Sequence, residues 1–198
     1  MTAWVSYSLI ALCFWGLWGF CEKMASRSVI PGNLIVSSSA GMRIKGAPGP
    51  DVYLGEGDLG IGANRVAGDA GNPLPNGTYP LTMSYNAANH ELTLVGPAAV
   101  SLLWDTDNAP ATCTAWDVLR ISTRDSVATG GIAFSSIVLN GVPLGNFGTV
   151  DVPGTVGWQY WSVVGFNITG NWTLTGNLDV VNLNSNESLK AEVTLGCS

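Results

Sequence analysis

Few residues of this 198-residue chain have the chemistry of a catalytic acid, base or nucleophile. His90 is the only histidine, and it stands between Asn89 and Glu91 beside a predicted turn. A Ser-His-Asp or Cys-His arrangement would have to use this residue, and most catalytic zinc sites need more than one histidine. We therefore interpret His90 as an exposed turn residue, and we expect no enzymatic activity.

Acidic residues point to two further kinds of chemistry. Glu56 and Asp58 are two positions apart, which places two carboxylates on one face of a strand, as in a glycosidase. Their setting is rich in glycine, so we interpret them as loop acids. With Asp51 and Asp69 they are oxygen ligands of the type that calcium prefers, although no complete calcium-loop signature is present. The hypothesis is one structural calcium ion and no other cofactor.

Three aromatic residues, Trp158, Tyr160 and Trp161, follow the Pro153-Gly154 turn. Strand alternation would place Trp158 and Tyr160 on one face and Trp161 on the other. Exposed rings at such a place can stack on sugar rings, which gives a carbohydrate-binding hypothesis. The alternative is that these aromatic side chains belong to the core.

The four cysteines fall into two pairs by position, and none has CxxC spacing. Cys13 and Cys21 lie in the first apolar segment, whereas Cys113 and Cys197 lie far apart in the polar remainder. If the remainder is exported, a Cys113–Cys197 disulfide closes a long loop and is worth on the order of 4 kcal/mol. The alternative is two unrelated buried thiols.

Charge and composition exclude some partners. The net charge is −6 and the sequence has no basic run, so nucleic acid is not an expected partner. Charged residues make up only 11% of the chain while Gly, Asn, Ser and Thr are abundant, which favours strands with tight turns over a helical bundle.

Residues 1–30 form an apolar segment of a different kind. The run from Ala3 to Cys21 contains no charge over 19 residues, close to the length of a membrane-spanning helix. Its basic residues, Lys23 and Arg27, follow the apolar run, whereas those of a signal peptide precede it. The sequence predicts a transmembrane or signal-like helix here, with the membrane as its partner if it is not cleaved.

Residues 31–198 alternate with the period of β-strands. In Asn171–Val180 the apolar positions fall on one face and the polar ones on the other, which indicates a half-buried strand. Similar segments are separated by turn signals such as Asn140-Gly141. We expect an all-β fold, an antiparallel β-sandwich of jelly-roll type, with a loop-rich region at residues 45–75 around one short strand at Val52–Leu54. The predicted core consists of Leu81, Met83, Leu92, Leu94, Leu119, Ile121, Phe134, Trp172, Leu174, Leu178, Val193 and Leu195.

Two segments resemble known families. Ser8–Phe20 with Glu22–Arg27 resembles the first helix of EamA-type drug/metabolite transporters, over about 25 residues. The stretches Phe134–Phe147, Trp161–Gly176 and Ser188–Gly196 are similar to bacterial exported β-sandwich proteins. Many of those proteins carry a PEP-CTERM sorting tail, which is absent here. This second resemblance covers residues 81–196 and implies a secreted or cell-surface location.

The resulting functional expectation is a non-catalytic protein with a structural or adhesive role, secreted or at the cell surface. Its partners would be a polysaccharide or other surface proteins. A carbohydrate-binding module is the alternative, and a fragment of a membrane transporter is the third hypothesis.

Overall fold

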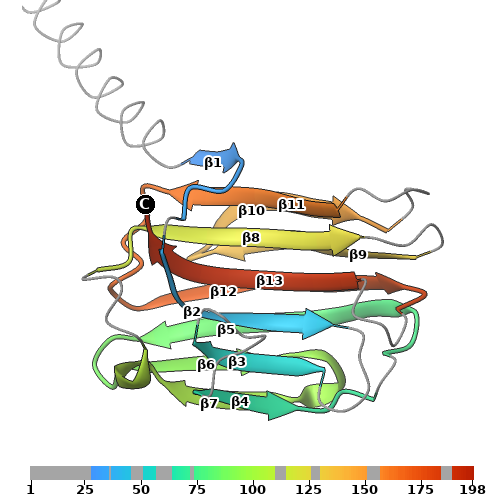
Figure 1. The fold of residues 1–198 in the computed structure, drawn as a ribbon, viewed down its shortest axis with the longest axis horizontal. Helices are drawn as coiled ribbons and strands as arrows, with labels where there is room; N and C mark the ends of the chain where they lie inside the picture. The colour runs from blue at the N-terminus through green and yellow to red at the C-terminus, as the bar shows by residue number, and fades with distance from the viewer. Residues whose placement is uncertain are drawn as a thin grey trace, which may run out of the picture.

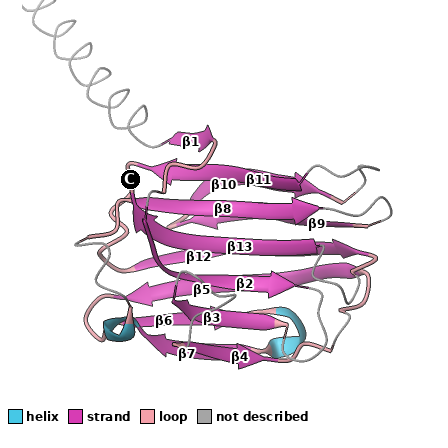
Figure 2. Cartoon of the chain, viewed as in Figure 1, coloured by secondary structure: helices cyan, strands magenta, loops and turns pink. Residues whose placement is uncertain are grey.

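The computed structural model describes residues 28–35, 37–45, 51–56, 64–71, 74–109, 115–125, 130–150, 157–183 and 189–198. These residues form two antiparallel sheets packed face to face, a β-sandwich (Figures 1 and 2). In Figure 1 the seven-stranded sheet lies in front of the six-stranded sheet. The prediction of an all-β sandwich is confirmed.

The seven-stranded sheet has the order β1-β11-β8-β13-β2-β3-β4. Its strands, in that order, are Ser28–Pro31, Gly157–Val164, Val118–Asp125, Leu189–Cys197, Ser37–Lys45, Val52–Glu56 and Arg65–Gly68. The six-stranded sheet has the order β10-β9-β12-β5-β6-β7. Its strands are Val142–Thr149, Gly131–Leu139, Trp172–Val181, Gly77–Asn86, Glu91–Val95 and Ser101–Asp105. Two short 3-10 helices, η1 (Pro97–Ala99) and η2 (Thr106–Asn108), flank β7.

The hydrophobic core lies between the two sheets, and every residue of the predicted core is buried. Strand β12 shows why the prediction succeeds, because Trp172, Leu174, Leu178 and Val180 face inward while the residues between them are exposed or half-buried. A strand that has water on one face must alternate in this way. The period of two in the sequence therefore identifies which residues of this strand face the core.

The region from residue 45 to 75 contains more strand than the sequence predicts. Besides β3, which covers the predicted short strand, β4 (Arg65–Gly68) extends the sheet at its edge. Strand β2 (Ser37–Lys45), just before this region, was not predicted either, yet Met42 and Ile44 on it are fully buried. Its first half is Ser-Ser-Ser-Ala-Gly, which has low intrinsic strand preference, so pairing with β13 and β3 imposes the conformation.

The apolar segment at the N-terminus falls on residues outside the described part, apart from its last three. Those three, residues 28–30, belong to β1, which pairs with β11 at the sheet edge. The sandwich therefore begins slightly before the predicted boundary at residue 31. None of the helices within the described ranges has the length and apolarity needed to cross a bilayer.

Candidate functional site

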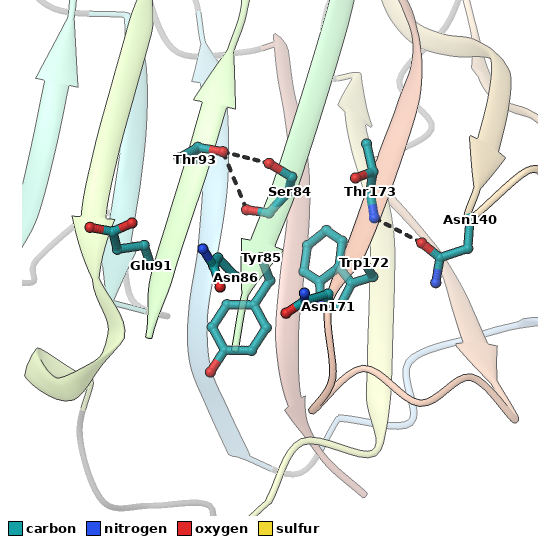
Figure 3. Close-up of a pocket in the computed structure, with 9 residues that line it drawn as sticks. All are labelled: Ser84, Tyr85, Asn86, Glu91, Thr93, Asn140, Asn171, Trp172 and Thr173. Atoms are coloured by element: carbon teal, nitrogen blue, oxygen red, sulfur yellow. Dashed lines mark hydrogen bonds between the residues drawn. The ribbon is translucent and has the colours of Figure 1, made fainter. Parts of the chain in front are cut away.

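An open polar hollow lies on the six-stranded sheet, at the ends of β6, β5 and β12 (Figure 3). Its volume is about 450 Å³. Polar side chains dominate the lining, which consists of Ser84, Tyr85, Asn86, Glu91, Thr93, Asn140, Asn171, Trp172 and Thr173. In Figure 3 Glu91 lies on one side of the hollow and Asn140 on the other.

Two tight turns bring these residues to the same end of the sheet. The β5–β6 connection places Asn86 directly opposite Glu91. The β9–β10 connection is the predicted Asn140-Gly141 turn, with φ of 50° and 78° at these two residues. Positive φ at both central positions is what a two-residue hairpin needs, and Asn followed by Gly tolerates it best. Asn140 then reaches β12, where its Oδ1 accepts from the Thr173 N–H at 2.9 Å.

The asparagines of the hollow share one arrangement. Asn171 Oδ1 accepts from the Ala87 N–H at 2.8 Å, and Asn86 Oδ1 accepts from the Ala88 N–H at 3.0 Å. Asn140 Oδ1 likewise accepts from the Thr173 N–H, so each of the three side-chain oxygens already accepts a backbone hydrogen bond that stabilises a turn. The three amide nitrogens have no partner in the described part of the chain, so they remain donors for a ligand.

Among the described residues, Glu91 is the only one with a charged side chain that lines the hollow. Its Oε2 accepts from Asn89 Nδ2 at 3.2 Å, which leaves further acceptor capacity on the carboxylate. Nearby, the hydroxyls of Ser84 and Thr93 bond to each other at 2.5 Å. Amide donors and a carboxylate acceptor around one hollow suit a ligand with several hydroxyl groups, because each hydroxyl both donates and accepts.

Aromatic rings form the base of this region. Trp172 is buried and donates from Nε1 to the Ile168 carbonyl at 3.0 Å, so it supports the hollow rather than offering a free ring face. Tyr85 is half-buried, 6.4 Å from Trp172 and 5.1 Å from Trp116 between ring centroids. The indole rings of Trp172 and Trp116 lie next to the hollow, so a change in their fluorescence would report binding there.

Sequence reasoning missed the hollow because its members come from four separate segments with no shared motif. The available signal was the concentration of asparagine in turns, which predicts the turns but not that they share one end of the sheet.

The structure brings together two of the three aromatic residues proposed for carbohydrate binding. Trp158 and Tyr160 lie on the outer face of β11 with their rings stacked, 5.8 Å apart between centroids and 13° apart in plane. Trp161 points to the opposite side and packs against the buried Phe147, 5.4 Å away. The rings of Trp158 and Tyr160 stack on each other, and this contact occupies ring faces that a sugar would need. The carbohydrate hypothesis for these residues stays a prediction.

Two of the four proposed calcium ligands lie near each other at the ends of β3 and β4. Asp51 is fully buried, and its Oδ1 accepts from the Ala70 N–H at 2.8 Å while Oδ2 has no partner among the described residues. Asp69 is exposed and accepts from the Gly71 N–H. Glu56 is the last residue of β3, and Asp58 lies outside the described residues. Within the described ranges, no group of three or more His, Cys, Asp or Glu residues could hold a metal ion. The calcium site stays a prediction.

The buried carboxyl of Asp51 gives a pH-dependent prediction. Burial raises the pKa of Asp51 above its ordinary value of 3.8 and the charge of Asp69 raises it further, against the lowering effect of its backbone hydrogen bonds. The pKa of Asp51 is therefore higher in the folded than in the unfolded protein. The free energy of unfolding of wild type falls as the pH rises from the unfolded-state pKa to the folded-state pKa. Above the folded-state pKa the whole cost of the buried charge remains. Asp51→Asn keeps the acceptor for Ala70 and removes the charge.

We expect the free energy of unfolding of Asp51→Asn, minus that of wild type, to increase from about pH 3 to about pH 7. Urea titrations in EDTA at several pH values measure this difference, with Asp179→Asn on the opposite sheet as the control. A difference that does not change with pH would contradict the argument.

Added calcium should stabilise wild type but not Asp51→Asn if the ion binds here, and an equal response of the two proteins would rule out the calcium hypothesis.

His90 lies in the β5–β6 turn, as predicted, and its side chain is 54% exposed. Its Nδ1 pairs with Asp107 Oδ1 at 2.6 Å. Among the described residues, no hydroxyl side chain forms a hydrogen bond with Nε2, the other ring nitrogen of His90. The pair connects the turn to η2 at the surface.

Cys197 ends β13 and is disulfide-bonded. Cys113 and the two N-terminal cysteines lie outside the described residues, so the Cys113–Cys197 pairing stays a prediction. The C-terminal end is also fastened by Ser198, whose N–H and hydroxyl donate to the Asp117 carboxylate at 2.9 and 2.8 Å.

Comparison with known proteins adds no family to this picture. No protein-family model matches the chain, and no curated protein matches its sequence.

Proposed function

We propose that this protein is a non-catalytic adhesive protein, secreted or exposed at the cell surface, that binds a neutral saccharide in the polar hollow. The observation that carries the proposal is the set of amide donors of Asn86, Asn140 and Asn171, whose oxygens already hold the turns. A ligand therefore meets donors fixed in advance, and it loses little free energy in ordering them.

The strand order supports a jelly-roll architecture for this binding scaffold. The central strands are β2-β13-β8-β11 in one sheet and β5-β12-β9-β10 in the other. Eight strands divided between two sheets in this order correspond to the two Greek keys of a jelly roll, a fold found in lectin domains. The β3–β4 and β6–β7 hairpins then widen the two sheets on the same side.

Export is supported by the end of the chain. Cys197 is disulfide-bonded, and Ser198 donates to Asp117, four residues after Cys113. Disulfides persist in oxidising compartments and are rare in the cytosol. A tethered terminal strand in an oxidising environment fits a protein that works outside the cytoplasm.

The chemistry of the hollow favours an uncharged ligand. Glu91 would repel an acidic sugar, while its remaining lone pairs accept from sugar hydroxyls. The hollow is open to solvent, so it admits an internal unit of a polysaccharide as well as a chain end.

Glu91→Ala tests the proposal. Hydrogen bonds to a charged group contribute about 1.5–3 kcal/mol when buried by a ligand, so we expect at least about tenfold weaker binding. Titrations of tryptophan fluorescence with galactomannan, soluble starch and hydroxyethylcellulose measure the affinity. The matched control is Asp179→Ala, which removes a carboxylate from the same face, where it accepts only from Thr78 in the described contacts.

Retained binding in Asp179→Ala with loss in Glu91→Ala supports the hollow as the site. If none of the three neutral polysaccharides binds wild type, or if Glu91→Ala binds as wild type does, the proposal fails.

A further inference from the structure

Strand β7, at one end of the six-stranded sheet, has an edge that no described strand covers. The sheet order ends in β5-β6-β7, and β7 lies at the lower border of the sandwich in Figure 1. Along β7 Trp104 is buried between the sheets, whereas Ser101, Leu103 and Asp105 are exposed. A strand edge of this kind is able to pair with a strand of another molecule.

The pairing of β7 with β6 shows which backbone groups of β7 face this edge. Thr106 N–H donates to the His90 carbonyl at 2.8 Å, and Gly96 N–H donates to the Val100 carbonyl at 2.8 Å. These bonds lie just beyond the two ends of the β6–β7 ladder, which has one unbroken register. In an antiparallel pair the hydrogen-bonded positions alternate along each strand. The even-numbered residues of β7 therefore direct their N–H and C=O groups toward β6, and the odd-numbered residues direct theirs toward the open edge.

The side chains beside this edge are unusually apolar for a surface. Leu103 is 53% exposed, and Val95 on the neighbouring β6 is 47% exposed, the two highest values among the exposed large apolar residues of the described ranges. Val95 lies directly opposite Ser101, so it shares the outer face of the sheet with Leu103. Pairing at this edge would remove apolar surface from water, which favours association.

The other three edge strands carry features that hinder pairing. Strand β1 has four residues and ends at Pro31, and β4 has four residues and begins with Arg65. Strand β10 contains Pro143 and shifts its register around Gly145. Proline, short length, basic charge and bulges are the means by which natural proteins block edge-to-edge pairing. Strand β7 has five residues with no Pro, Lys, Arg or register shift, so among the described edges it is the one best suited to pairing.

We propose that β7 pairs with β7 of a second copy of this chain, antiparallel and centred on Leu103. The strand is self-complementary in this register, because Leu103 meets its own counterpart and Ser101 meets Asp105 of the second copy. No like charges face each other across the contact, and the Ser101 hydroxyl is placed to donate to the opposite carboxylate. The odd-numbered residues supply the N–H and C=O groups of the new ladder, and the two six-stranded sheets become one continuous sheet.

The association is expected to be weak. A pair of five-residue strands buries less area than a standard protein interface of about 1,600 Å². Each copy also carries a net charge of −6, which opposes the contact at low salt. We expect a dissociation constant on the order of 100 μM, so the chain is a monomer in dilute solution and a dimer where it is concentrated.

The geometry of the pair has a consequence for binding. Its two-fold axis is perpendicular to the joined sheet, so the polar hollows of both copies open on the same face. One long saccharide would then engage two hollows, with a gain in overall affinity. This consequence rests on the proposed function, whereas the pairing of β7 does not.

Sedimentation velocity of the full-length protein at increasing concentration, without saccharide, tests the pairing. We expect Leu103→Lys to raise the dissociation constant at least about tenfold, because it places two like charges directly opposite each other at the centre of the contact. The control is Thr175→Lys, an exposed position on β12 of the same sheet, which makes the same change in net charge. Every variant keeps the N-terminal segment, so any association through that segment is common to all of them.

Leu103→Cys tests the register. The Cα atoms of a hydrogen-bonded antiparallel pair lie about 5.5 Å apart, which is within the range that a disulfide needs. Mild oxidation should therefore cross-link Leu103→Cys into a covalent dimer. The control is Val95→Cys, which is similarly exposed but lies away from the two-fold axis.

Three outcomes would overturn the proposal: a wild-type chain that stays monomeric at every concentration, equal dissociation constants for Leu103→Lys and Thr175→Lys, or equal cross-linking of Leu103→Cys and Val95→Cys. None of these measurements contains a saccharide, so their failure is distinguishable from failure of the polar hollow to bind one.

Discussion

Replacing Phe134 with alanine is expected to lower the free energy of unfolding by about 3–5 kcal/mol. Phe134 is fully buried in the middle of β9, directly opposite Phe147 on β10 and Leu178 on β12. Both neighbours are themselves buried and fixed in regular strands, so they cannot collapse into the space that the ring leaves. Urea unfolding of wild type and variant, followed by fluorescence, measures the loss.

The matched control is Leu103→Ala on β7, where the side chain is 53% exposed. This variant should change stability by less than about 0.5 kcal/mol, because an exposed site loses little packing. A loss below about 1.5 kcal/mol in Phe134→Ala would mean that the two sheets are not packed as tightly as their burial indicates.

The core was predictable because each long strand has the core on one face and solvent or loops on the other. On β5, Leu81 and Met83 are buried while Thr82 and Ser84 are half-buried, and the sequence shows the same alternation. Strand β13 is harder to interpret, because Glu192 and Thr194 on its outer face are as buried as Ala191 and Val193. Alternation still identified the inward positions, since polar and apolar side chains mark the two faces even where both are covered.

The polar hollow was not predictable in the same way, because it depends on which strands become neighbours. Glu91 and Asn140 are far apart in the chain, yet the sheet order β9-β12-β5-β6 places both around the same hollow. Asn140 lies beside Thr173 for the same reason, through the pairing of β9 with β12.

Glu192 on β13 stabilises the seven-stranded sheet through two arginine side chains. Its carboxylate neutralises Arg43. Burial lowers the pKa of Arg120, and the negative charge of Glu192 acts against that lowering. Arg120 itself donates to Asn33 Oδ1 and Thr194 Oγ1, which link the segment after β1 to β13. Removal of Glu192 therefore affects two guanidinium groups at once.

Glu192→Ala is expected to lower the free energy of unfolding by about 3 kcal/mol, because breaking a buried ion pair leaves an unpaired buried charge. The side chains of Arg43 and Glu192 are only 13% and 7% exposed, so water compensates little of the loss. In the double variant Arg43→Met with Glu192→Leu, apolar groups replace both partners, and we expect most of the stability to return. Urea unfolding of the variants measures both effects. A loss below about 1 kcal/mol in Glu192→Ala would show that the pair behaves like an exposed salt bridge, and the double variant would then show no recovery.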